Sequence, residues 1–212
     1  MVEKKHFNIK TKESRRHYYT RRPDTEPKMI IIKFKYKDIE FKIYSSTSIF
    51  SKSHIDPASQ LLIDRAKVFG DVLDMGCGYG VVGIVLKKLN PEINMYMSDI
   101  NSRAVHLAKK NLMVNNVPAE IKHGWVFEPW KNRKFDVILI NPPMSAGREV
   151  CMQMIRESFY RLNKGGMLEI VSNHNKGGNT LKEYMYEKFN NVEDLAKKGG
   201  FRVYASKKTS AD

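Results

Sequence analysis

The sequence predicts an α/β fold in which helices pack on a mostly parallel β-sheet. An apolar run at 135–140 has the composition of a strand that is buried on both faces. A second strand-like run, at 72–75, leads into a glycine-rich loop and then into an apolar helix. Further along the chain, strand-like and helix-like segments alternate, which is the order expected of β-α-β units.

The amino-terminal part is predicted to be a basic extension that carries a β-hairpin. The first ~25 residues are polar and basic, a composition typical of loosely ordered segments. Segments 30–34 and 39–43 then flank Lys37-Asp38 and predict two antiparallel strands. We therefore expect a basic extension over residues 1–52 and the main domain over residues 53–212.

The main domain is predicted to begin with a helix within 53–68, with Asp56 as its cap and Pro57 in its first turn. Strands and helices alternate after it. The predicted strands are 72–75, 93–98, 119–123, 135–140 and 167–172, and the predicted helices are 81–86, 103–115, 149–162 and 181–189. Gly165-Gly166 are expected to close the helix at 149–162. Segments 192–196 and 201–205 predict a closing hairpin around Gly199-Gly200.

The glycine loop predicts a ligand site at the carboxyl end of the first strand of the main domain. Glycines let the backbone approach a ligand closely, and the amino end of the next helix offers unpaired N–H groups. The spacing of Gly78, Gly80 and Gly83 also matches a dinucleotide fingerprint, so a nicotinamide enzyme is one alternative. Asp74 disfavours that alternative, because its carboxylate would repel a pyrophosphate and attract an ammonium group.

The second strand of the main domain ends at Asp99. In nucleoside-binding folds, an acidic residue about 20 residues past the glycines pairs with the ribose hydroxyls. Capping the next helix is the competing interpretation of this residue. Because Asn101 or Ser102 can serve as that cap, we expect Asp99 to bind a ribose.

Asn141-Pro142-Pro143-Met144 follows the buried strand at 135–140 directly. Ligands of open α/β sheets bind in the crevice at the carboxyl ends of the strands. Proline has no N–H group, and two prolines in succession stiffen the loop. The Asn141 amide and the Pro142 carbonyl are then free to accept hydrogen bonds from a planar –NH2 group of adenine, guanine or a glutamine amide. With the two carboxylates, this corner predicts methylation of an exocyclic nitrogen by S-adenosylmethionine.

The chain resembles the small-domain methyltransferase family, which includes guanine-N2 methyltransferases of small-subunit ribosomal RNA. The likeness is strongest to the compact, single-domain archaeal branch and extends from His17 to Lys208. The matching stretches are His17-Tyr18-Tyr19, Phe50-Ser51, Ile55-Asp56, 73–80, 98–105, Asn141-Pro142-Pro143, 146–150 and 199–203.

This resemblance implies a Rossmann-like class I methyltransferase fold. Its sheet would be mostly parallel and seven-stranded, with a C-terminal antiparallel hairpin, and the N-terminal β-hairpin would be an extension. The residues that the resemblance places at the cofactor are Asp74, Gly76, Cys77, Gly78, Gly80, Asp99, Ile100, Trp125 and Asn141. Those that it places in catalysis are Asn141 and Pro142. Those that we expect to contact the substrate are Pro143, Met144, Phe50 and Arg148.

Two positions depart from the family pattern. Many members carry an acidic residue near the adenine, where this chain has Gly124-Trp125. Because a Trp side chain only donates hydrogen bonds, adenine recognition would there rest on backbone groups or stacking. Many amino-methyltransferases end the Asn-Pro-Pro motif in an aromatic residue, where this chain has Met144. Phe50 is our candidate for stacking on the target base.

The charge of the chain favours a nucleic-acid substrate. The formal net charge is +14, and the first 42 residues hold 13 Lys and Arg against 6 Asp and Glu. Arg15-Arg16 and Arg21-Arg22 flank His17-Tyr18-Tyr19, a mixture of cations and aromatic rings typical of segments that bind single strands. A solvated lysine-rich surface is the competing interpretation of any single cluster. We expect RNA as the partner, with ribosomal RNA ahead of transfer RNA.

The sequence also bears on membrane segments, metal sites, cellular location and the alternative functions. No apolar run approaches the ~18 residues of a membrane span, and the histidines show no ligand spacing, so we expect neither a membrane segment nor a metal site. Cys77 and Cys151 lie far apart, which favours a cytoplasmic location. The remaining alternatives are methylation of adenine N6 or of a protein glutamine, and an RNA-binding protein that keeps the fold without catalysis.

Overall fold

The computed structural model describes residues 29–46, 54–142 and 147–209. The strands are β1 (Met29–Tyr36), β2 (Ile39–Ser46), β3 (Asp71–Met75), β4 (Asn94–Asp99), β5 (Glu120–His123), β6 (Phe135–Ile140), β7 (Leu162–Asn173), β8 (Glu193–Lys198) and β9 (Phe201–Lys207). The helices are α2 (Pro57–Arg65), α3 (Val81–Leu89), α4 (Ser102–Val114), α5 (Arg148–Arg161) and α6 (Asn179–Phe189), with two short helical segments, η1 (Glu128–Trp130) and η3 (His174–Gly178).

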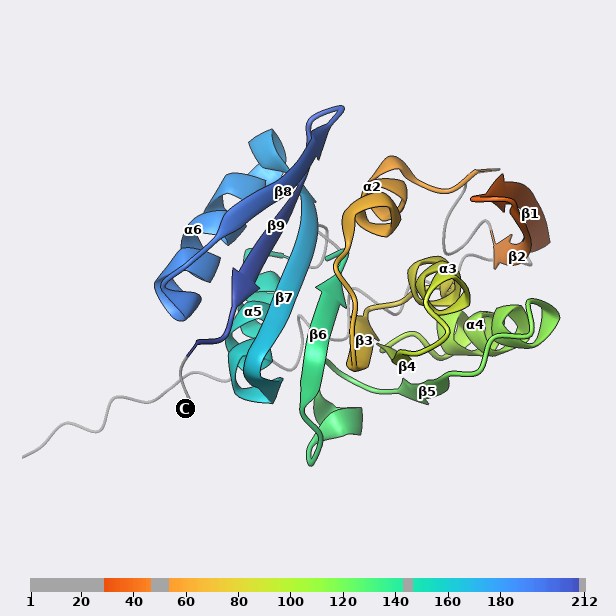
Figure 1. Ribbon diagram of the computed structural model, residues 1–212, viewed down its shortest axis with the longest axis horizontal. Coiled ribbons are helices and arrows are strands. Elements are labelled where there is room, and N and C mark those ends of the chain that lie inside the picture. The colour runs from red at the N-terminus through yellow and green to blue at the C-terminus, as the bar shows by residue number, and fades with distance from the viewer. Residues whose placement is uncertain (1–28, 47–53, 143–146, 210–212) are drawn as a thin grey trace, which may run out of the picture.

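Seven of the strands form one mostly parallel sheet, as the sequence predicts (Figure 1). Its order is β5-β4-β3-β6-β7-β9-β8, and the first five strands in this order run parallel. Strand β9 runs antiparallel to both β7 and β8, which confirms the predicted C-terminal hairpin. Strand β3, which precedes the glycine loop, lies in the middle of the sheet, so its carboxyl end is flanked by those of β4 and β6.

Helices cover both faces of this sheet. One hydrophobic cluster joins α2, α3 and α4 to one face, and a second joins α5, α6 and η1 to the other. Both clusters draw on the central strands, because side chains of a strand alternate between the two faces of a sheet. The predicted cap of the first helix is confirmed, since Asp56 accepts the N–H of Ser59 at 2.9 Å. Over the described ranges, no helix combines the length and the apolar composition that crossing a membrane requires.

One predicted boundary is wrong. Gly165-Gly166 do not close a helix, because α5 passes directly into β7 and the two glycines lie inside that strand. The pairing register between β6 and β7 shifts at this point. A Cβ atom on Gly166 would lie 2.9 Å from the carbonyl oxygen of Asp136. The glycines therefore belong to an irregular stretch of strand, where the backbone of β7 passes too close to β6 for a side chain.

The predicted amino-terminal hairpin is confirmed as a two-stranded sheet. It turns at Lys37 and Asp38, whose φ angles of +44° and +65° are those of a tight two-residue hairpin turn. Its inner face contributes Ile32, Phe41 and Ile43 to the hydrophobic cluster that also contains α2, α3 and α4. The boundary that we predict between residues 52 and 53 lies outside the described residues.

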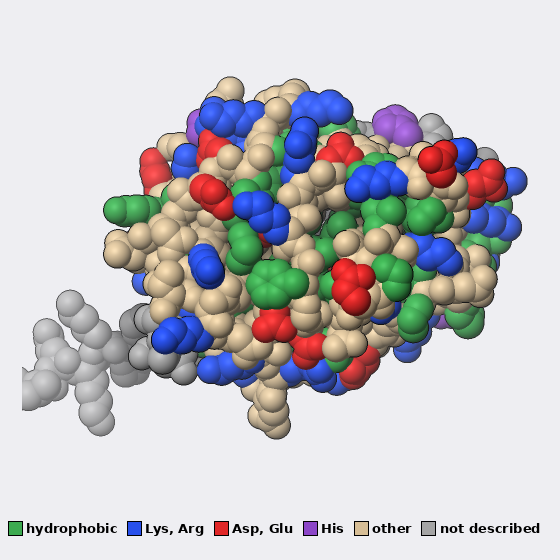
Figure 2. Space-filling model, viewed as in Figure 1, with side chains coloured by type: hydrophobic (Ala, Val, Ile, Leu, Met, Phe, Trp, Pro, Cys, Tyr) green, Lys and Arg blue, Asp and Glu red, His purple; other side chains and the backbone are tan. Residues whose placement is uncertain are grey.

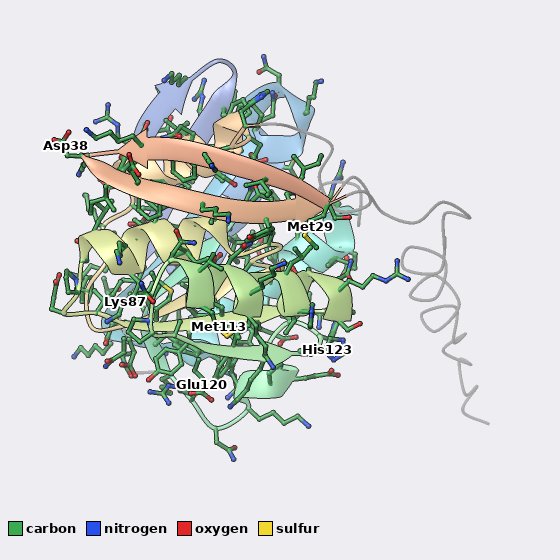
Figure 3. The ribbon with its side chains drawn as sticks, turned by 90° about the vertical axis from the view of Figure 1, so that its right-hand side faces the viewer. Met29, Asp38, Lys87, Met113, Glu120 and His123 are labelled. Carbon is green, nitrogen blue, oxygen red and sulfur yellow. The ribbon has the colours of Figure 1, made fainter. Side chains whose placement is uncertain are left out.

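Asn111 of α4 and Asn115, which follows the last residue of α4, bind the outer edge of this hairpin, which Figure 3 shows beside α4. Lys42 donates its N–H to Asn115 at 3.1 Å, and the Asn115 amide donates to the Lys42 carbonyl at 2.9 Å. Asn111 makes the same pair of bonds with Tyr44, each at 2.8 Å. The Asn111 amide also donates to the carbonyl of Tyr79 in the glycine loop at 2.8 Å. A single buried side chain thus joins the hairpin, α4 and the glycine loop.

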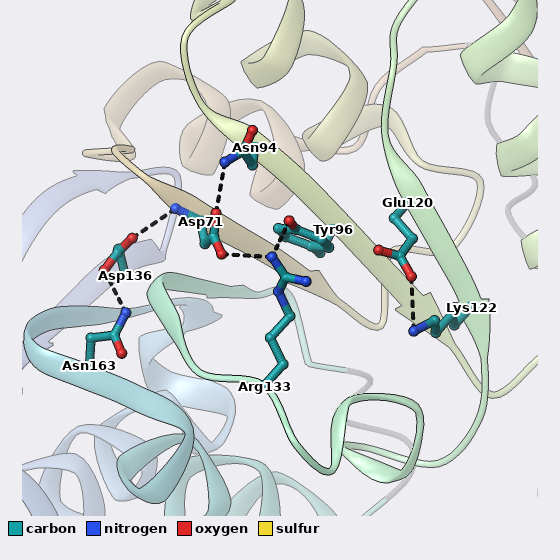
Figure 4. A network of polar contacts seen from close by, with 8 residues as sticks. All are labelled: Asp71, Asn94, Tyr96, Glu120, Lys122, Arg133, Asp136 and Asn163. Atoms are coloured by element: carbon teal, nitrogen blue, oxygen red, sulfur yellow. Dashed lines mark hydrogen bonds and ion pairs between the residues drawn. The ribbon is translucent and has the colours of Figure 1, made fainter.

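A polar network holds the amino ends of the central strands, at the edge opposite the glycine loop (Figure 4). Arg133 donates to Asp71 at 2.8 Å and also to the hydroxyl of Tyr96. Asn94 donates to the other oxygen of Asp71 at 2.9 Å, and the Asp71 N–H donates to Asp136 at 2.8 Å. Because these residues come from β3, β4 and β6 and from the loop before β6, the network favours the observed alignment of the three strands.

Replacement of Asn111 by alanine should weaken the fold more than replacement of Asn115. The first change removes the partner of three backbone groups, which are the N–H and the carbonyl of Tyr44 and the carbonyl of Tyr79. Each buried group left without a partner costs about 1–3 kcal/mol. We expect a loss of about 3 kcal/mol in the free energy of unfolding for Asn111→Ala and a smaller loss for Asn115→Ala. Urea denaturation measures both; equal losses would contradict the special position of Asn111.

Candidate active site

The parallel register aligns the carboxyl ends of strands β3, β4 and β6. Met75 of β3 lies opposite Ser98 of β4 and Ile140 of β6. The residues that come next in the sequence therefore lie side by side at this edge of the sheet. They are Gly76, Asp99 and Asn141. This edge is where open α/β sheets bind ligands. The structure thus places the predicted glycine turn, the predicted ribose carboxylate and the predicted amine acceptor on three adjacent strands.

Asp74 lies one residue below this level and is almost completely buried, with 3% of its surface exposed. Its Oδ2 accepts the N–H of Gly83 at 2.9 Å, in the first turn of α3. No described residue donates a hydrogen bond to its Oδ1. A Cβ atom on Gly83 would lie 3.2 Å from Asp74 Oδ2, so a side chain there would crowd the carboxylate. The sequence pattern assigns Gly83 to a dinucleotide fingerprint and misses this contact.

Burial raises the pKa of Asp74 to about 7, against the pull of the hydrogen bond from Gly83. The negative charge of Asp99 raises the pKa further. A carboxylate in this environment is ionised most readily when a cation lies beside it. The α-ammonium group of an amino acid would supply that cation.

The glycine loop leaves room above the sheet edge. Gly80, before α3, has φ +90°, and a Cβ atom there would lie 2.9 Å from Met97 and 3.1 Å from Ala108. Gly80 therefore lets the loop lie close against β4 and α4. A Cβ atom on Gly76, in contrast, would meet no described atom within 4 Å. The open space is thus above Gly76, beside Asp74 and Asp99.

Asp99 binds one backbone group of the glycine loop and one at the start of α4. Its Oδ2 accepts the N–H of Gly78 at 2.8 Å, and its Oδ1 accepts the N–H of Asn101 at 2.7 Å. Burial raises the pKa of Asp99, while these hydrogen bonds and the nearby charge of His123 lower it. Asn101, not Asp99, caps α4, because its side chain accepts the N–H groups of the first turn. A carboxylate oxygen accepts more than one hydrogen bond, so Asp99 can also accept from ribose hydroxyls.

Asn141 is positioned by a residue that the sequence analysis does not single out. Its Nδ2 donates to the hydroxyl oxygen of Ser59 at 3.1 Å, and Ser59 is buried in α2. Figure 1 shows α2 beside the tip of the β6 arrow, where this contact forms. No described residue donates to Asn141 Oδ1, so the amide oxygen is available to a ligand. Asp56 and Pro57 indicated the start of this helix, but no motif indicated that its third residue, Ser59, would reach Asn141.

The structure places the other predicted site residues less centrally. Cys77 is buried inside the loop, and the Ile100 carbonyl contacts His123 Nε2 at 2.8 Å. Trp125 donates its backbone N–H to Glu128 at 3.3 Å, and its ring packs against the cluster around α5 and α6. Arg148 begins α5 with an exposed side chain.

Three of the predicted substrate contacts, Phe50, Pro143 and Met144, lie outside the described residues. Pro142 is described and buried, at the point where β6 ends. The parts of the site that the structure brings together are therefore the glycine turn, the two carboxylates and the pair Asn141-Pro142, which we call the Asn141 corner.

These groups fit one kind of ligand. The buried Asp74, whose pKa is raised to about 7, would be ionised by a cation beside it, Gly76 leaves open space, and Asp99 presents a carboxylate one strand away. A molecule that joins an α-amino acid to a nucleoside satisfies all three. The fold and the site together define a Rossmann-like methyltransferase that uses S-adenosylmethionine.

Comparison with known proteins agrees with this class. A family model described as the methyltransferase small domain matches residues 40–205. The chain belongs to this family, and its cofactor is S-adenosylmethionine. The nicotinamide alternative is therefore wrong, and the glycines at 78, 80 and 83 are part of a methyltransferase loop.

Two relatives differ in how much of their length the chain covers. It is 32% identical over 197 residues to the uncharacterized protein YbxB of Bacillus subtilis, covering 91% of this chain and 98% of that protein. It is 35% identical over 171 residues to ribosomal RNA small subunit methyltransferase C of Haemophilus influenzae, covering 78% of this chain. The matched region is 51% of that enzyme, so the chain spans about half the length of the Haemophilus relative.

Solved structures share the fold. The T. thermophilus 16S rRNA N2 methyltransferase RsmC, in complex with AdoMet and guanosine, superimposes with a TM-score of 0.73 at 24% identity. The superposition covers 88% of this chain and 52% of that one. A methyltransferase from Pyrococcus furiosus superimposes with a TM-score of 0.62 at 20% identity, over 77% of this chain and 92% of that one.

The affinity for S-adenosylmethionine should rise with pH between 6 and 7.5. A cationic ligand beside Asp74 favours its ionised form, so binding below pH 7 must release the proton that the raised pKa retains. With a pKa of about 7, the affinity should be about eightfold lower at pH 6 than at pH 7.5. Calorimetry in buffers of different ionisation enthalpy measures both the affinity and the released proton.

Asp74→Asn should bind more weakly and lose this pH dependence. Glu92→Gln, which changes an exposed carboxyl group, is the matched control and should behave as the wild type. A wild-type affinity that stays constant over this pH range would contradict the role of Asp74.

Proposed function

We propose that the protein methylates an exocyclic amine of an RNA base, and that this amine is N2 of guanine in ribosomal RNA. The single observation that carries the reaction type is the Asn141 corner. Ser59 holds the amide group, no described residue donates to Asn141 Oδ1, and the buried Pro142 follows just past the end of β6. Two fixed acceptors at the end of one strand suit the two hydrogens of a planar –NH2 group.

The choice of guanine and of ribosomal RNA rests on the relatives. The Haemophilus relative is named as a ribosomal RNA small subunit methyltransferase, and the T. thermophilus neighbour as a 16S rRNA N2 methyltransferase solved with guanosine. The net charge of +14 supports a polyanionic substrate. Adenine N6 would present the same two hydrogens to the corner, so the base needs a direct measurement.

Asn141 and Pro142 would act by orientation and by charge. The lone pair of an exocyclic amine is delocalised into the ring, so the site must turn this lone pair toward the methyl donor. By accepting both hydrogens, the two residues fix the amine and stabilise the positive charge that develops on its nitrogen. Bound S-adenosylmethionine supplies an electrophilic methyl group. No strong base is required, because the proton can leave after the transfer.

The position of the corner restricts the state of the RNA. It lies at the end of a central strand, between the edge of the sheet and the buried helix α2. A base inside a helical stack could not enter there, so the target nucleotide would be single-stranded, looped or flipped out of a duplex.

Ribosomal RNA from cells without this protein should lack one N2-methylguanosine. Mass spectrometry of nucleosides from small-subunit ribosomal RNA and from transfer RNA, compared with the parent strain, would reveal the missing product. Loss of N6-methyladenosine would replace guanine by adenine in the proposal. Unchanged RNA nucleosides, with methyl transfer to a protein glutamine, would reject an RNA substrate.

Asn141→Ala should lower kcat by at least about a hundredfold and leave the affinity for S-adenosylmethionine nearly unchanged. Ser59→Ala should lower kcat by roughly tenfold, because the amide group loses the acceptor that orients it. The matched control is Ser158→Ala, which removes a buried serine hydroxyl of α5 that bonds within its own helix. Kinetics with RNA and cofactor titrations measure both quantities. A cofactor affinity lost in parallel with kcat in the Ser59 variant would contradict the positioning role.

A further inference from the structure

The outer face of the amino-terminal hairpin carries a cluster of cations that the cofactor site does not use. We define the lysine cluster as Lys33 of β1, Lys42 of β2 and Lys110 of α4, which surround the ring of Tyr44. Lys33 and Lys42 are exposed, and the hairpin that carries them is fixed to α4 by Asn111 and Asn115.

Lys33 and Lys42 lie directly opposite each other in the two-stranded sheet. The N–H and the carbonyl of Lys42 both bond to Asn115, so they point away from β1 and the two lysines form a non-hydrogen-bonded pair. In such a pair the Cα atoms are only about 4.5 Å apart and the side chains are close. Like charges in this position repel each other and weaken the sheet.

No described carboxylate forms an ion pair that offsets this repulsion, and Glu40, on the same face of the hairpin, lies opposite Lys35. None of the three lysines forms an ion pair with a described carboxylate, while Asp38 at the turn pairs with Lys35 at 2.9 Å. The contrast with another face is clear in Figure 2, where Lys and Arg side chains are interspersed with Asp and Glu. On β8, for example, Asp194 pairs with Lys182 at 2.7 Å and with Arg202 at 3.0 Å.

The pKa of Tyr44 is lowered by the positive charge of the lysine cluster. Lys110 Nζ lies 3.9 Å from the centre of its ring, and Lys42 Nζ lies 5.1 Å from it. A hydrogen bond from Lys42 lowers the pKa of the Tyr44 hydroxyl, against the effect of burial. The charges of all three lysines lower it further. Two ammonium groups thus lie within 5.1 Å of the centre of one ring, so an anion near the ring would be attracted by more than one charge.

The hairpin also has a definite direction relative to the active site. Figure 3 shows Asp38 at one end of the hairpin and Met29 at the other, with Met29 on the same side of the molecule as His123. His123 pairs with Asp99 in the sheet and so marks the active-site edge. The lysine cluster lies between the two ends of the hairpin, so a chain bound along it would extend toward that edge.

We propose that the lysine cluster binds the phosphodiester backbone of the RNA substrate next to the target nucleotide. This inference rests on the proposed RNA methyltransferase function and adds the surface that holds the strand. Two opposed lysines and a third over the tyrosine ring match the repeated negative charge of a polynucleotide, and binding it removes the repulsion within the hairpin. Contacts to the backbone position an RNA without reading its sequence.

The test compares two double variants that remove the same charge. Lys33→Gln with Lys42→Gln changes the cluster. Lys131→Gln with Lys164→Gln changes two exposed lysines near the amino ends of β6 and β7, at the opposite edge of the sheet. The dissociation constant of each protein for small-subunit ribosomal RNA, stripped of protein, is measured at several salt concentrations. Methyl transfer to the same RNA is measured in parallel.

We expect the cluster variant to bind RNA roughly tenfold more weakly and to lose about 1.4 from the slope of log affinity against log salt concentration, about 0.7 for each lost contact. The control variant should bind within about twofold of the wild type. Thermal unfolding checks that the cluster variant folds, and its melting temperature should not fall, because the repulsion is gone.

Equal RNA affinities for the two double variants would overturn the inference, whether the cluster then binds an acidic protein or only water. A wild-type protein that transfers no methyl group to any RNA would instead reject the proposed function. The two failures are therefore distinguishable in one set of measurements.

Discussion

The active site depends on the parallel alignment of three central strands. Because Met75, Ser98 and Ile140 lie at one level, the residues that follow them meet at one edge of the sheet. A shift of one residue in any of these pairings would turn that strand's side chains to the opposite face. The polar network at the amino ends of the same strands, centred on Asp71 and Arg133, lies where it can resist such a shift. The site is thus assembled by backbone pairing before any ligand is present.

The buried carboxylate of Asp74 has a role in the fold and a predicted role in cofactor binding. Its hydrogen bond to Gly83 attaches the first turn of α3 to β3, while its second oxygen is open to a cation. Burying a charge costs free energy, and the raised pKa expresses that cost. Asp99 would have the same double use, since it holds the glycine loop at Gly78 and the start of α4 at Asn101, and it is the residue that we predict to bind a ribose. The protein thus keeps two poorly solvated carboxylates at the edge where we predict the ammonium group and the ribose of its cofactor to bind.

Much of the fold could be predicted from local signals. The β-hairpin at Lys37-Asp38, the cap at Asp56 and the alternating strands all follow from turn chemistry and hydrophobic period, and the structure confirms them. Contacts between segments far apart in the sequence could not be predicted in this way. Ser59 meets Asn141 across 82 residues, and Asn111 meets Tyr44 across 67, and neither pair has a motif. Gly165-Gly166 were wrongly predicted to end a helix, because glycines at the end of a helix and glycines in an irregular strand have the same local pattern.

The central claim is that the corner after β6 orients a planar amine toward the methyl donor. A crystal structure of the protein with S-adenosylmethionine and guanosine tests it most directly. We expect the exocyclic nitrogen of guanosine to lie about 3 Å from Asn141 Oδ1 and from the Pro142 carbonyl oxygen, with the sulfonium methyl group on the other side of this nitrogen. A guanosine whose amine contacts neither oxygen, in a complex that still transfers the methyl group, would contradict it.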